Sequence, residues 1–173
     1  MPLFLRLSST EWMEETDLGK QLGNWDVESS IALAKIVPDL GIDLLDVSSG
    51  GNHPQQRLSL FGASSRDYQT RIAARIRKEI HAANKKLLIG AVGLITEADQ
   101  ARDLVEDNPS IQKEAEAAKD MVEVRNGEQA SADVILVARQ FMREPEWVLR
   151  IAHSLGLDVA WPSQFLRVRF PRL

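Results

Sequence analysis

The sequence predicts an α/β fold built from four consecutive βα units with parallel strands. Three observations support this: four short apolar runs, amphipathic segments between them, and a length of 173 residues, which suits one domain. The apolar runs are Leu3–Leu7, Ile42–Val47, Leu87–Val92 and Val134–Ala138. Each is nearly continuous, as expected of parallel strands that are covered on both faces.

The segments between the first three runs have helical patterns. Before the second run, Val27, Ile31 and Ala34 fall on one helical face, and Pro38 should end that helix. Before the third run, an i, i+4 apolar stripe predicts a second helix. Its members are Tyr68, Ile72, Ile76 and Ile80.

The last two helices are predicted from start and stop signals. Thr96 and Asp99 have the spacing of a capping box at the start of the third helix. Pro145 suits the first turn of the fourth helix, and Gly156 can close it. Segment 107–132 is rich in acidic residues and interrupts the pattern, so we interpret it as a surface insertion without a chemical role.

Composition excludes several classes of function. The net charge of −4 gives no reason to expect nucleic acid as a partner. Without cysteine the chain has no disulfide, no thiolate catalysis and no Cys-ligated metal. No apolar run approaches the roughly 18 residues of a membrane helix, so a cytoplasmic protein without membrane contact is expected. We predict no metal site.

Repeated βα units fit two architectures, an open doubly wound sheet or a closed eight-stranded barrel. A complete barrel takes about 250 residues, and four strands are half of its number. Four strands alone leave two unpaired edges. We therefore expect either a homo-oligomer or a complementing half.

Two glycine-rich turns follow predicted strands, where α/β folds place ligands. Gly90 and Gly93 end the third strand, and glycine lets backbone N–H groups approach an anion. Arg139 follows the fourth strand, and a guanidinium can grip a phosphate with two hydrogen bonds. The alternative for the glycine pair is an ordinary tight turn.

The first and second strands carry two further candidates. Ser49 and Gly50 follow the second strand and offer similar bare backbone, or else form an ordinary loop. Arg6 lies within the first strand, where a charge needs a partner. It could form a salt bridge with an acid such as Asp46, or face an electron-rich ligand.

Five motifs together resemble the C-terminal half of the NADH:flavin oxidoreductases, the Old Yellow Enzyme family, and most closely its NADPH-dehydrogenase-like branch. They are "PLFLRLSSTEW", "LLDVSSGGN", "IGAVGLIT", "ARQFMREPEWVLRIA" and "WPSQFLR". The resemblance covers nearly the whole chain except 107–132. It implies a TIM barrel that binds FMN, with residues 1–173 forming one half-barrel domain of strands 5–8.

The resemblance also implies roles for individual residues. Arg6 matches an arginine beside the flavin pyrimidine, and Ser49 and Gly50 match a loop beside the ribityl phosphate. The expected phosphate grip consists of Val92, Gly93, Ala138 and Arg139. Most relatives have glycine where Ala138 stands. The extra methyl group of Ala138 tightens the approach of the backbone to the phosphate in this chain without abolishing it.

At the C-terminus, Arg167 matches an arginine that reaches a neighbouring subunit's active site in this branch. Relatives usually have tyrosine where Phe165 stands. A solvated basic tail is the alternative. The resemblance gives this chain no counterpart of the His/His or His/Asn pair that binds the substrate carbonyl, or of the proton-donating tyrosine, both supplied by the family's first half. No residue is therefore assigned as catalytic.

The family reaction implied is hydride transfer from NAD(P)H through FMN to an activated alkene, commonly an enone. The first hypothesis is therefore an FMN-dependent NADPH dehydrogenase present as a half barrel. The alternatives are an inactive remnant or interaction module of the same family, and a general phosphosugar-binding half barrel.

Overall fold

The computed structural model describes residues 1–51, 53–57, 67–107 and 130–168. Its strands are β1 (Phe4–Ser8), β2 (Leu44–Ser48), β3 (Leu88–Val92) and β4 (Val134–Leu136). They form one sheet in the order β1-β2-β3-β4, and every neighbouring pair is parallel. The predicted α/β class is confirmed, since strand order follows chain order as in half of a TIM barrel.

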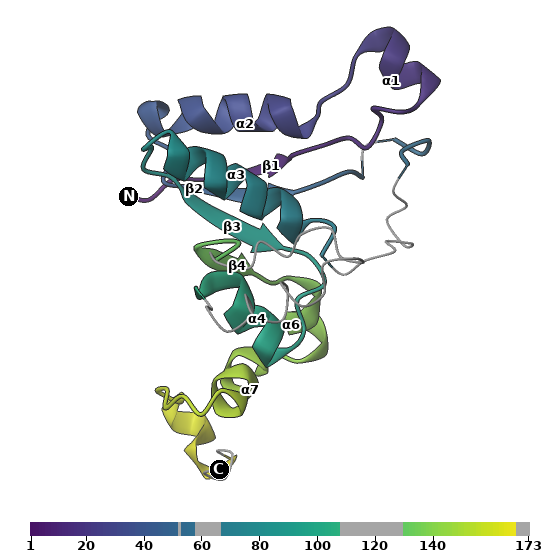
Figure 1. Cartoon of the computed structure of the whole chain (residues 1–173). Coiled ribbons are helices and arrows are strands. Elements are labelled where there is room, and N and C mark those ends of the chain that lie inside the picture. Colours follow the sequence, from purple (N-terminus) through teal and green to yellow (C-terminus); the bar gives the residue numbers. More distant parts are fainter. Residues whose placement is uncertain (52, 58–66, 108–129, 169–173) are drawn as a thin grey trace, which may run out of the picture.

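Helices connect the strands and cover one side of the sheet. The chain forms α1 (Asp17–Leu22), α2 (Val27–Ile36), α3 (Thr70–Ala82), α4 (Ala98–Val105), α6 (Arg139–Arg143) and α7 (Trp147–Ser154). Two 3₁₀ helices are η1 (Val37–Leu40) and η2 (Ser163–Val168). Figure 1 shows this succession from α2 and β1 at the top to α7 and η2 at the bottom.

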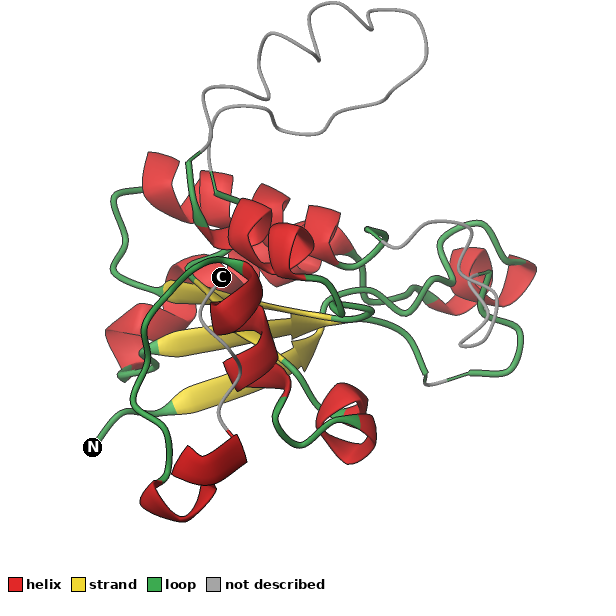
Figure 2. Cartoon of the chain, turned by 90° about the horizontal axis from the view of Figure 1, so that it is seen from below, coloured by secondary structure: helices red, strands yellow, loops and turns green. Residues whose placement is uncertain are grey.

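The main core lies between the sheet and helices α2 and α3. Alternate strand residues point toward the helices. Those that enter this core are Leu5, Leu7, Leu45, Val47, Ile89 and Ala91, packed against Ile31, Ala34, Ile72, Ile76 and Ile80. Figure 2, seen from below, shows several helices above the strands, while other helices lie beside and below them. We call the side of the sheet that packs against α2 and α3 the outer face.

The opposite face, which we call the inner face, bears the remaining strand residues, such as Phe4, Arg6, Asp46, Leu88 and Gly90. Two of its apolar side chains are open to solvent, since Phe4 is 61% exposed and Leu88 is 52% exposed. The expectation of strands covered on both faces therefore fails at Phe4 and Leu88, whereas Leu44 and Asp46 of β2 are buried. A half barrel exposes the face that points into the ring, because no strand stands opposite.

Three local predictions need correction or adjustment, and a fourth is not tested. Helix α4 has Glu97 as its N-cap without a side-chain cap bond, so the capping box of Thr96 and Asp99 does not form. Pro145 lies in the turn before α7, not in its first turn. Tyr68 precedes α3 and stacks near Trp12, with 6.5 Å between ring centroids. The predicted insertion at 107–132 lies almost wholly outside the described residues.

A second, smaller hydrophobic core lies between α4 and α7, in the C-terminal part of the structure. Leu104 of α4 packs there with Trp147 and Ile151 of α7 and with Ile95, which precedes α4. Among the described residues, no helix has the length and apolar composition needed to cross a membrane.

Candidate functional site

The loops that carry most of the predicted site residues lie at one edge of the sheet. Because all four strands are parallel, their carboxyl ends share that edge, where the strand arrows of Figure 1 point. Ser8 pairs with Ser48, and Val92 pairs with Leu136. Gly93 and Val137 therefore leave the sheet side by side.

The turn after β3 needs glycine for two reasons. Gly93 has φ of +114°, a conformation that side-chain-bearing residues rarely adopt. A Cβ at this position would also lie only 3.0 Å from Gln69 Nε2. Bare backbone is thus required where the turn passes Gln69.

Gln69 links two of the loops, and the sequence analysis did not identify it. Its side-chain amide donates to the Val92 carbonyl at 2.8 Å, and its Oε1 accepts from Ser49 Oγ at 2.9 Å. The residue is 6% exposed. A glutamine just before a helix gives no strong sequence signal, because its amide bonds are known only once the loops are placed.

The loops after β1 and β2 are held together in a similar way. Gly50 has φ of +64°, its N–H donates to the Thr10 carbonyl at 2.8 Å, and its carbonyl accepts from Ser8 Oγ at 3.2 Å. A Cβ at Gly50 would come within 2.9 Å of Trp12 Cδ1. Three loops are therefore fixed before any ligand binds.

Arg139 supplies a cation at the same edge. It opens α6 directly after Ala138, and both residues are exposed. Within the described part of the chain, no hydrogen bond or ion pair involves the Arg139 side chain. Arg57, by comparison, pairs with Glu15 at 2.5 Å. Gly93 and Arg139 thus follow neighbouring strands at the same edge of the sheet, although no contact joins them.

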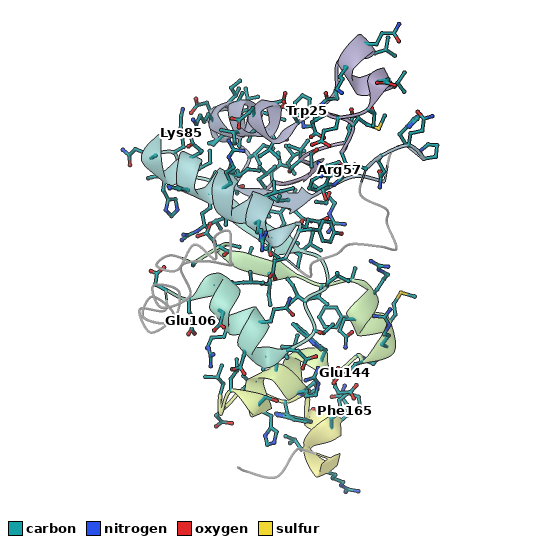
Figure 3. The ribbon with its side chains drawn as sticks, turned by 45° about the vertical axis from the view of Figure 1, so that its right-hand side comes forward. Trp25, Arg57, Lys85, Glu106, Glu144 and Phe165 are labelled. Atoms are coloured by element: carbon teal, nitrogen blue, oxygen red, sulfur yellow. The ribbon has the colours of Figure 1, made fainter. Side chains whose placement is uncertain are left out.

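A polar junction fixes the turn that leads from β3 into α4. The Thr96 carbonyl accepts from Trp147 Nε1 at 3.0 Å and from Arg150 Nη2 at 3.1 Å. Arg150 Nε also donates to Glu144 Oε1 at 2.5 Å. The hydrogen bond from Arg150 lowers the pKa of the Glu144 carboxyl, burial opposes this, and Gln140 lowers it further. Figure 3 shows Glu144 at the α6–α7 junction.

Arg6 lies below this edge, on the inner face. The register of β1 and β2 places it opposite Asp46, and its Nε donates to Asp46 Oδ2 at 2.5 Å. The salt bridge considered from sequence is therefore present. Arg6 remains 57% exposed at its side chain.

The remaining site candidate, Arg167, lies away from the edge, as do two histidines of the helices. Arg167 is exposed on η2, beyond α7 in Figure 1, and Phe165 is exposed beside it, with its label in the lower part of Figure 3. His81 and His153 occupy the last turns of α3 and α7. No cluster of three metal-ligating side chains occurs among the residues that the structure describes.

Taken together, the edge presents bare backbone and a cation without an ion-pair partner among the described residues. Glycine turns let N–H groups approach a ligand closely, and an arginine adds a forked pair of donors. Such a combination suits an anion with several acceptor oxygens.

Comparison with known proteins relates this chain to flavin-linked reductases. A scan against protein-family models finds no match. An NADH:flavin oxidoreductase of Gibberella zeae is 29% identical over 165 residues, which are 94% of this chain and 33% of the relative. NADPH dehydrogenases of Halalkalibacterium halodurans and Bacillus velezensis are 32% and 30% identical over 166 residues, 96% of this chain and 37% of each relative.

These matches run through nearly the whole chain but only part of each relative. The chain spans about a third of the length of the curated relatives it matches. By sequence and by its parallel half-barrel sheet, the chain is a homologue of the NADH:flavin oxidoreductases and NADPH dehydrogenases.

Proposed function

We propose that this chain is the FMN-binding part of an NAD(P)H-dependent oxidoreductase, with the flavin phosphate held at the C-terminal edge of the sheet. The observation that carries the proposal is that the segments after the neighbouring strands β3 and β4, which contain Gly93 and Arg139, leave the sheet at that same edge. When bound, FMN would pass hydride from NAD(P)H to an activated alkene such as an enone. The proposed location is the cytoplasm, where NAD(P)H is available.

The residues present fit a phosphate group. At Gly93 a Cβ would come within 3.0 Å of Gln69 Nε2, so the turn keeps this conformation only with glycine. The backbone of Val92 and Ala138 flanks the turn, and the Arg139 guanidinium has no ion-pair partner within the described residues. Four such donors would hold the phosphate oxygens without a metal.

The remaining candidates take positions that suit the rest of the flavin. Ser49 and Gly50 lie in the loop after β2, where Ser49 Oγ donates to Gln69 Oε1, and this loop would lie beside the ribityl phosphate. Arg6, on the inner face, would lie beside the pyrimidine ring. We assign no residue of this chain to protonating the alkene substrate.

A complete reaction also requires more structure than this chain supplies. The chain spans about a third of its relatives, and its inner face is open. We propose that a complementing half, or a second copy of this chain, closes the ring, with Arg167 as a candidate contact to a neighbouring subunit. The open inner face also favours a second function, an inactive module that docks on such a partner.

Binding of FMN to the purified chain tests the proposal. Flavin fluorescence should fall on titration into the protein, and Arg139→Ala should raise Kd by roughly 10- to 150-fold, the worth of a hydrogen bond to a charged group. Arg143→Ala, an exposed arginine in the same helix, is the matched control and should leave Kd unchanged. A chain that never quenches flavin fluorescence, or an unaffected Arg139→Ala variant, contradicts the phosphate assignment.

A further inference from the structure

The Arg6–Asp46 pair on the inner face is asymmetric in exposure. The Asp46 side chain is 6% exposed, whereas that of Arg6 is 57% exposed. The carboxylate of Asp46 is therefore buried, and the guanidinium of Arg6 extends from it toward solvent. The two residues lie directly opposite each other in neighbouring strands.

The pair is joined by a single hydrogen bond. Arg6 Nε donates to Asp46 Oδ2 at 2.5 Å, and the structure describes no acceptor for either terminal nitrogen of Arg6 within the residues it covers. Asp46 Oδ1 is buried and has no hydrogen-bond partner. A pair arranged only for stability would satisfy both oxygens through the forked guanidinium. This arrangement instead leaves the far edge of the guanidinium unused.

The surroundings keep that edge accessible. The next strand places Gly90 beside Asp46, and this residue contributes no side chain of its own. A Cβ at residue 90 would come within 2.4 Å of Leu136 Cδ1 and 3.4 Å of Leu44 Cδ2, so apolar side chains occupy the space over Gly90 next to the Arg6–Asp46 pair. A flat ligand with polar atoms on its edge fits these surroundings better than a hydrated ion does.

We propose that Asp46 is a positioning residue for Arg6. By holding Nε, it turns the two terminal amino groups of Arg6 toward the inner face, where they can donate to adjacent acceptors on the edge of an electron-rich heterocycle. This inference rests on the proposed function, in which that heterocycle is the flavin pyrimidine. Asp46 itself does not contact the ring; it acts through Arg6.

The hold of Asp46 on Arg6 can be measured without ligand. In ¹⁵N NMR of the full chain, the Arg6 Nε–H should be shifted downfield and should exchange slowly with water. Asp46→Asn should abolish both effects, and Asp46→Glu should restore them in part. Asp43→Asn alters a neighbouring exposed carboxyl that accepts from the Leu3 amide, and it should leave the Arg6 signal unchanged. An Arg6 signal that is unchanged in Asp46→Asn overturns the proposal.

Flavin titration then tests the consequence for binding. Asp46→Asn should raise the Kd for FMN by about tenfold, and adding Arg6→Ala to that variant should change Kd little further, because both act through one guanidinium. Effects that multiply independently would overturn a positioning role.

The two proposals fail in different ways. If the wild-type chain does not bind FMN, the proposed function fails, while the NMR result still decides whether Asp46 holds Arg6. If FMN binds and Asp46→Asn binds it equally well, the inference fails and the proposed function stands.

Discussion

Gly90 and Gly93 are three residues apart on and after β3, but the structure constrains them differently. Gly93 has φ of +114° and backs onto Gln69. Gly93→Ala should therefore lower the free energy of unfolding by about 1–3 kcal/mol, the usual cost of an unfavourable backbone conformation. At Gly90 the nearest obstacle is the mobile end of the Leu136 side chain.

Gly90→Ala is the matched comparison. Leu136 can rotate away, so we expect Gly90→Ala to cost less than about 1 kcal/mol. Urea unfolding followed by circular dichroism gives both values. A larger loss for Gly90→Ala than for Gly93→Ala would show that backbone conformation is not the limiting factor at the turn.

The Arg6–Asp46 pair gives a prediction about stability at the same scale. Arg6→Met leaves a buried carboxylate unpaired and should destabilise the fold by roughly 2–4 kcal/mol, toward the low end for such pairs because Arg6 is half exposed. The double variant Arg6→Met with Asp46→Leu removes both charges and should regain wild-type stability to within about 1 kcal/mol. Thermal unfolding of the three proteins measures this. A double variant as unstable as Arg6→Met would mean that the pair itself stabilises the sheet.

Helices α6 and α7 are joined at Glu144, and the junction should respond to acid. Hydrogen bonding from Arg150 places the pKa of the Glu144 carboxyl below its ordinary value of 4.5. The unfolded chain therefore binds more protons than the folded chain near that pH. The contribution of Glu144 to stability is complete above pH 4.5 and is lost as pH falls through the lower, folded pKa.

Replacing this carboxyl should weaken the pH dependence. The free energy of unfolding of Glu144→Gln should fall less between about pH 6 and about pH 3 than that of the wild type. Glu146→Gln, at an exposed neighbour, serves as the control and should follow the wild-type curve. Identical acid limbs for Glu144→Gln and wild type would rule out this linkage. Urea titrations across the pH range supply the comparison.

At the scale of elements, hydrophobic periodicity predicted the strands and helix ends that depend on local sequence. All four apolar runs became strands, and Pro38 ended α2 as expected, because burial and proline geometry act within a few residues. The capping box failed because Gln100 takes the local hydrogen bonds: its side chain accepts from the Thr96 N–H and donates to the Leu94 carbonyl. The spacing of Thr96 and Asp99 alone does not indicate that Gln100 competes for the same backbone groups.

The site shows the same division between local and long-range information. The glycine turn and Arg139 could be predicted because each follows a strand, and parallel strands bring their ends together. Gln69 could not be, because its partners Ser49 and Val92 are far along the chain from it. The single-bond geometry of Arg6 and Asp46 likewise depends on the register of two strands.

For the whole molecule, the sheet resembles half of a ring whose interior faces solvent. Strands β1 and β4 each pair on one side only within the described sheet, and Leu88 is 52% exposed on the inner face. Open strand edges and exposed apolar faces favour association. We therefore expect the purified chain to form a dimer or larger species at micromolar concentration, with the inner face buried between copies.

Leu88→Glu tests which surface is buried in that species. A charge on the inner face should shift the chain toward monomer in size-exclusion chromatography with light scattering, without lowering monomer stability, because Leu88 is already half exposed. Leu40→Glu is the control, since Leu40 is 71% exposed on η1 and should leave assembly unchanged. A wild-type chain that stays monomeric would argue against pairing of two copies and would leave a complementing half as the partner that closes the ring. Of the two substituted residues, only Leu88 lies on the inner face. Equal effects of the two variants on assembly would therefore place the interface away from that face.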